Sequence, residues 1–73
     1  MAGYAKTEAE IADRVSRYLK AELKRADVTY EGLAERLAKH GLKGETADSI
    51  KAKLMRGTFP ATFLLATVAA LEM

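Results

Sequence analysis

Few side chains in this sequence could carry out catalysis. The 73 residues include one histidine, His40, and no cysteine, asparagine or glutamine. A hydrolytic triad needs a nucleophile, a base and an orienting group, while disulfides and thiolate metal sites need cysteine. His40 is expected at the end of a helix, where the helix dipole stabilises its charged form. The composition therefore predicts a protein that is not an enzyme and that uses no metal or cofactor.

Two further patterns have simpler interpretations. Glu31 and Glu35 are four residues apart on one helix face, but Arg36 and Lys39 are close enough to form ordinary surface ion pairs with them. The segment 41–44 contains two glycines and a lysine, but it lacks the spacing of a phosphate-binding loop and no strand is expected before it. Neither pattern predicts catalysis.

Positive charge is concentrated in the middle of the chain. The net charge is +2, and residues 36–56 hold six basic and two acidic residues, whereas the remainder holds six basic and eight acidic ones. Lys51, Lys53 and Arg56 lie on the free side of an expected helix, which is typical of a protein that reads the major groove of DNA. The same residues could instead only solvate the helix and complement the dipole at its C-terminus.

Four helices are expected to position these residues, at about residues 7–25, 29–40, 46–56 and 60–71. Threonines provide N-caps for the first three helices, and Pro60 is tolerated in the first turn of the fourth. Gly41 fits the left-handed position after the second helix, with Leu42 folding back on Leu37. Residues 1–73 are therefore predicted to form one all-α domain, a small four-helix bundle with a helix-turn-helix-like arrangement.

Apolar residues at helical spacing predict one shared core. The first helix is expected to contribute an apolar stripe made of Ile11, Val15, Tyr18, Leu19 and Leu23. The residues expected to be buried together from the other three helices are Leu33, Leu37, Ile50, Leu54 and Leu64. In the last helix Phe63, Val68 and Leu71 are expected to close the core together with Leu64.

The stretch Thr29-Tyr30-Glu31-Gly32-Leu33-Ala34-Glu35-Arg36-Leu37 resembles the first helix of the helix-turn-helix in lambda-repressor-like regulators of the Cro and xenobiotic-response-element type. Downstream, Ser49-Ile50-Lys51 through Arg56-Gly57, then Pro60 and a Leu/Ala-rich helix, is similar to the end of their recognition helix and the helix after it. The resemblance covers about Tyr18 to Leu71 and implies this fold and regulation of transcription through DNA. The Leu-Ala…Arg-Gly-Thr-Phe pattern is also similar to a family of bacterial domains for which no activity is established.

Two departures from that pattern affect the third helix. The link over Gly41 to Glu45 is longer than the usual short turn, and Ile50 and Leu54 are four residues apart where three is more usual. They leave open whether the third helix is rotated or retracted, and whether standard docking in the major groove is retained.

The sequence predicts a DNA-binding domain of a transcriptional regulator. A homodimer is compatible with this function, because closed two-fold dimers are the commonest assembly, and the sequence leaves the oligomeric state open. Without asparagine or glutamine, lysine or arginine contacting guanine is the expected way of reading bases. Charges at Lys6 and Lys20, before and within the first helix, are expected to matter less. The expected contacts to double-stranded DNA are Ser49, Lys51, Lys53 and Arg56 on the third helix, and Thr29, Tyr30, Arg36 and Lys43 for the phosphates.

The alternative is a protein-interaction or dimerisation module without direct DNA contact. Its apolar patch would use Met55, Phe59, Tyr4 or the alanine-rich last helix. For either function a cytoplasmic location away from the membrane is expected, because the sequence has no cysteine, no apolar leader and no apolar segment of spanning length.

Overall fold

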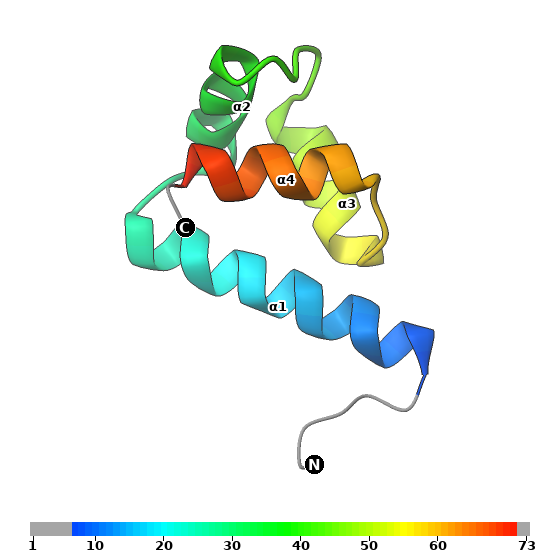
Figure 1. Cartoon of the computed structure of the whole chain (residues 1–73). Coiled ribbons are helices and arrows are strands. Elements are labelled where there is room, and N and C mark those ends of the chain that lie inside the picture. The colour runs from blue at the N-terminus through cyan, green and yellow to red at the C-terminus, as the bar shows by residue number, and fades with distance from the viewer. Residues whose placement is uncertain (1–6, 72–73) are drawn as a thin grey trace.

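The described part of the chain folds into four α-helices joined by short loops (Figure 1). The computed structural model describes residues 7–71, and within that range it contains no strand. The predicted all-α class is therefore confirmed, and each helix begins within about one residue of its expected start. The helices are α1 (Glu8–Ala26), α2 (Tyr30–Lys39), α3 (Ala47–Arg56) and α4 (Ala61–Ala70).

Threonine side chains cap the first three helices, because each supplies an acceptor for a backbone N–H that has no partner within its own helix. Thr29 Oγ1 accepts a hydrogen bond from the N–H of Gly32 at 3.0 Å. At the start of α3 the bonds are reciprocal: Thr46 Oγ1 accepts from the N–H of Ser49 at 3.1 Å, and Ser49 Oγ accepts from the N–H of Thr46 at 2.8 Å. Pro60 is the N-cap of α4 rather than a residue of its first turn.

A Schellman motif ends α2, as predicted. The N–H of Leu42 donates to the carbonyl of Leu37 at 2.9 Å, and the N–H of Gly41 donates to the carbonyl of Ala38 at 3.2 Å. Gly41 has a φ of +90°, which a residue without Cβ adopts at little cost. The motif turns the chain into the loop over residues 40–46 that leads to α3.

The core lies where α3 packs on α1 and α2 and where α2 packs on α4. Four of the five residues expected there are confirmed, but Leu64 is only half-buried. Phe63, which was also expected to close the core, is confirmed as buried, and its ring packs against Phe59 with the ring centroids 5.1 Å apart. The buried hydrophobic residues are Leu19, Leu23, Leu33, Leu37, Ile50, Leu54, Phe63 and Ala70.

The buried side of α1 differs from the expected stripe. Ile11 and Tyr18 are 53% and 56% exposed, whereas Ser16 is buried and donates its hydroxyl to the backbone carbonyl of Leu54. The expectation was wrong for two of its five residues because α1 packs on α3 and not on α4, so that only a narrow side of the helix is covered. Ser16 can lie inside because the carbonyl of α3 satisfies its hydroxyl.

Two features concern α4. At its C-terminal end Arg36 Nη1 donates to the carbonyl of Ala70 at 3.2 Å, so the side chain satisfies one of the carbonyls left open at a helix end.

The helix α4 carries no charged residue, but it is only ten residues long. Over residues 7–71, no helix combines the length and the apolar character needed to cross a membrane.

Candidate nucleic-acid interface

A hollow between α1 and α3 brings together basic residues that are far apart in the sequence. Arg17 and Lys20 of α1 line it from one side, and Arg56 of α3 lines it from the other. Met55, which is 72% exposed, lies beside Arg56 in the same hollow. Ser16 and Leu54 form the floor, where their hydrogen bond holds the two helices in contact.

A second hollow lies at the corner between α1 and α2. Lys20 and Lys24 of α1 line it together with Thr29 and Tyr30, the N-cap and first residue of α2. Lys20 therefore lines both hollows and connects them along α1. A helix N-terminus next to lysines suits a phosphate group, because backbone N–H groups and the helix dipole both favour negative charge there.

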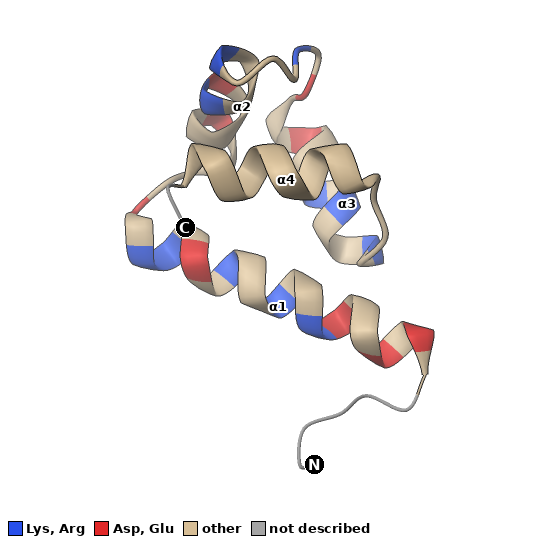
Figure 2. Ribbon diagram, viewed as in Figure 1, with Lys and Arg blue, Asp and Glu red and all other residues tan. Residues whose placement is uncertain are grey.

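The outer face of α3 completes this side of the molecule. Lys51 is exposed and precedes Met55 by four residues, so both side chains lie on one helix face. We call this surface the basic face. Its residues are Arg17, Lys20 and Lys24 of α1, Thr29 and Tyr30 of α2, and Lys51, Met55 and Arg56 of α3. Figure 2 shows lysines and arginines along α1 and in the later turns of α3, whereas α4 carries no charge.

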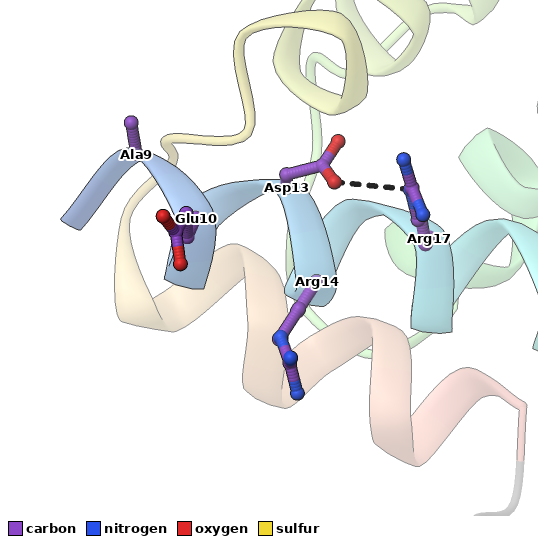
Figure 3. Close-up of a pocket in the computed structure, with 5 residues that line it drawn as sticks. All are labelled: Ala9, Glu10, Asp13, Arg14 and Arg17. Atoms are coloured by element: carbon purple, nitrogen blue, oxygen red, sulfur yellow. Dashed lines mark ion pairs between the residues drawn. The ribbon is translucent and has the colours of Figure 1, made fainter. Parts of the chain in front are cut away.

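Most of the cations of the basic face are free to bind an anion. Within residues 7–71, Lys20, Lys24, Lys51 and Arg56 form no ion pair. Arg17 is the exception, because Asp13 Oδ2 lies 3.0 Å from its Nε (Figure 3). Both side chains of that pair are largely exposed, so the pair is weak and a phosphate could displace the carboxylate.

The hollow drawn in Figure 3 is a shallow surface of α1 alone. Asp13 points toward Arg17 in it, while Arg14 points away from that pair. No other helix contributes a side chain to it, so it offers a ligand only one wall. We therefore do not regard it as part of the site.

Ser49 and Lys53 were expected to contact DNA, but in the structure both side chains bind Glu45. The Oε1 atom of Glu45 accepts a hydrogen bond from Ser49 Oγ at 2.7 Å and lies 3.1 Å from Lys53 Nζ. The side chains of Lys53 and Glu45 are only 19% and 12% exposed, and Lys53 Nζ also lies 5.7 Å from the ring centroid of Phe63. These interactions hold the start of α3 and turn Lys53 away from solvent, which corrects its expected position on the outer face.

We expect Glu45→Ala to lower the free energy of unfolding by about 1–3 kcal/mol, because the half-buried Lys53 ammonium would lose its anionic partner. Asp13→Ala is the matched control, since it breaks an exposed ion pair and should change stability by less than about 0.5 kcal/mol. Urea unfolding followed by circular dichroism measures both. Equal effects of the two substitutions would show that the cluster of Glu45, Ser49 and Lys53, here called the Glu45 cluster, does not stabilise the fold.

Arg36 and Lys43 also lie apart from the basic face. Arg36 was expected to bind phosphate, but its guanidinium is engaged with the end of α4. Lys43 is exposed in the loop between Gly41 and Gly44 and lines neither hollow of the basic face. Of the eight expected contact residues, the structure brings four to one side: Thr29, Tyr30, Lys51 and Arg56.

The apolar patch of the alternative function is divided between different surfaces. Met55 lies on the basic face, whereas Phe59 lies beside α4 with its ring against Phe63. Tyr4, like Lys6, falls outside the described residues. No single patch therefore unites the described residues that were expected to form it.

His40 occupies the expected place at the end of α2. It is the C-cap residue and is exposed. Over residues 7–71, no three histidine, aspartate or glutamate side chains gather as they would around a metal ion.

The chain can be placed in a family. Residues 3–73 match the family described as a domain of unknown function, DUF6471. The chain belongs to DUF6471. That description assigns the DUF6471 family no ligand and no activity. No curated protein and no solved structure matches the chain.

Arg17, Lys20 and Lys24 are the candidate contacts that sequence reasoning missed. Their spacing of three and four residues places them on one face of α1, and this spacing could have revealed a basic face in the sequence. What the spacing could not reveal is that this face borders the outer side of α3. The four-residue spacing from Glu45 to Ser49 and from Ser49 to Lys53 could likewise have indicated that these three side chains meet.

Proposed function

We propose that this domain binds double-stranded DNA through the basic face and acts as a cytoplasmic regulatory domain rather than an enzyme. The observation that carries the proposal is the gathering of unpaired cations from two helices on one side of the molecule. Lys20 and Lys24 come from α1, and Lys51 and Arg56 come from α3. Such clustering is what recognition of a phosphate backbone requires.

Within this proposal the two helices have different roles. Lys51 and Met55 on the outer face of α3 approach base edges, and Lys51 contacts guanine because lysine matches its major-groove acceptors. The cations of α1 and the N-terminus of α2 contact phosphates, which fixes the orientation of the domain on the duplex. The resemblance of residues 29–37 to the first helix of lambda-repressor-like helix-turn-helix domains supports the same partner.

The test is a titration of labelled mixed-sequence duplex DNA, followed by fluorescence anisotropy at two salt concentrations. With Lys20, Lys24 and Arg56 on phosphates, affinity should fall roughly fortyfold between about 50 and 200 mM salt, because each neutralised phosphate contributes about 0.9 to the logarithmic slope. Binding that is undetectable at the lower salt concentration, or that does not change with salt, would contradict the proposal.

A further inference from the structure

The helix α4 has no charged residue on any side. From Gly57 to Leu71 the sequence is uncharged, and helices that are apolar all round are normally buried on all sides. Here α4 is fully buried only at Phe63, Thr67 and Ala70, while Ala66 and Val68 are partly buried. Leu65 remains 72% exposed, and Leu64 is half-buried.

An apolar groove separates α4 from α1. The two helices do not pack on each other, and the space between them is open to solvent. Ile11 and Val15 line it from α1, Phe59 lines it from the loop before α4, and Leu64 lines it from the first turn of α4. Tyr18, seven residues after Ile11, lies on the same side of α1 and is also exposed. We call these five residues the apolar face.

The apolar face and the basic face lie on opposite flanks of α1. The buried residues Leu19 and Leu23 mark the side of α1 that packs on the core. At 100° per residue, Ile11 and Tyr18 fall on one flank of that side and Lys20 on the other. A partner that binds the apolar face would therefore leave the basic face exposed to solvent.

The charges along α1 indicate what covers the apolar face. Residues 8–16 hold three acidic residues and one basic residue, whereas residues 17–26 hold four basic residues and one acidic residue, so the helix has an acidic and a basic end. Two such helices lying antiparallel place each acidic end beside a basic end, whereas a parallel pair would place like charges together. The α1 helix is thus complementary to a second α1 running in the opposite direction.

We propose that a second copy of this chain covers the apolar face in a two-fold dimer with antiparallel α1 helices. Tyr18 of each copy enters the groove of the other beside Val15. Glu8 of each lies near Arg25 of the second copy, whose side chain is 75% exposed and also pairs with Glu22 of its own helix at 3.1 Å. Such a contact is isologous, the type found in closed dimers. The proposal does not rest on DNA binding, because the apolar face shares no residue with the basic face.

The first test is sedimentation equilibrium of the full chain over a wide concentration range. The wild type should dimerise, and the double variant Ile11→Ser/Tyr18→Ser should raise the dissociation constant at least tenfold, since the dimer would lose four buried apolar side chains. Leu65→Ser is the matched control, because Leu65 is more exposed but lines a different hollow, between α4 and the end of α2. Circular dichroism shows whether each variant is folded.

Two results would overturn the proposal. If the wild type stays monomeric at all concentrations, the apolar face does not bind a second copy and a different protein would have to cover it. If the control variant weakens the dimer as much as the double variant, the dimer contact does not lie on the apolar face.

The direction of the helices can be tested by disulfide cross-linking, because the chain has no cysteine of its own. Glu8→Cys and Arg25→Cys chains should cross-link to each other when mixed and oxidised. Glu8→Cys alone should not cross-link, since 17 residues of helix place the two thiols roughly 25 Å apart in an antiparallel pair, far beyond disulfide reach. Efficient cross-linking of Glu8→Cys with itself would contradict the antiparallel arrangement.

Discussion

Replacing Gly57 with alanine is expected to lower the free energy of unfolding by about 3 kcal/mol, a large part of the roughly 4–11 kcal/mol that a domain of this size possesses. Gly57 ends α3 with a φ of +74°, where a side chain is strained. An added Cβ would also lie 2.9 Å from the backbone oxygen of Ala12. That oxygen belongs to α1, so relief of the clash requires the helices to separate.

Gly41→Ala is the matched control for this prediction. Gly41 has a φ of +90°, but an added Cβ would meet nothing within 4 Å. It should therefore show the backbone strain alone, about 1–2 kcal/mol. Urea unfolding of both variants separates the two contributions. Equal losses would show that the close approach of α3 to α1 contributes nothing to stability.

This close approach also bears on the proposed function. Gly57 lines the same hollow as Arg17, Lys20 and Arg56. A larger residue at position 57 would move α1 away from the end of α3 and separate the cations of the two helices. The residue that permits dense packing is thus also one that shapes the basic face.

The helices themselves could be predicted because their signals are local. Threonine N-caps, the Gly41 turn and the apolar spacing of Leu33 and Leu37 each involve residues within a few positions of one another. Local hydrogen bonds and helical periodicity fix such features whatever the rest of the chain does. The same applies to the position of His40.

The side of α1 that is buried could not be predicted in the same way. Tyr18 fits an apolar stripe by type, but whether it is covered depends on where α4 lies, and α4 does not pack on α1. Ser16 is buried because a carbonyl of α3, 38 residues away in the sequence, accepts its hydroxyl. Both outcomes depend on tertiary contacts that periodicity does not encode.

The candidate site was partly predictable for a related reason. Lys51 and Arg56 follow from the pattern of α3 alone, and both are exposed. Lys53 has the same charge and lies in the same helix, but Glu45 in the preceding loop binds it. Charge counting treats these three residues as equivalent, whereas the bond to Glu45 removes one of them from solvent.

The strongest effect on DNA binding is expected from reversing charges on the basic face. Lys51→Glu and Lys20→Glu should each weaken binding about 10- to 100-fold, because each removes a charge-assisted bond to phosphate or base. The double variant should lose roughly a thousandfold if the two contacts are independent. Fluorescence anisotropy at low salt measures each dissociation constant.

Lys39→Glu provides the matched control, because it changes the net charge by the same amount. Lys39 is exposed at the end of α2 and lines neither hollow of the basic face. If binding depended only on overall charge, all three single variants would bind DNA with the same reduced affinity. If α3 alone contacted DNA, Lys20→Glu would resemble the control, as the sequence had led us to expect. Because Lys20 connects both hollows, we expect it to resemble Lys51 instead, and the control to change affinity by less than about threefold.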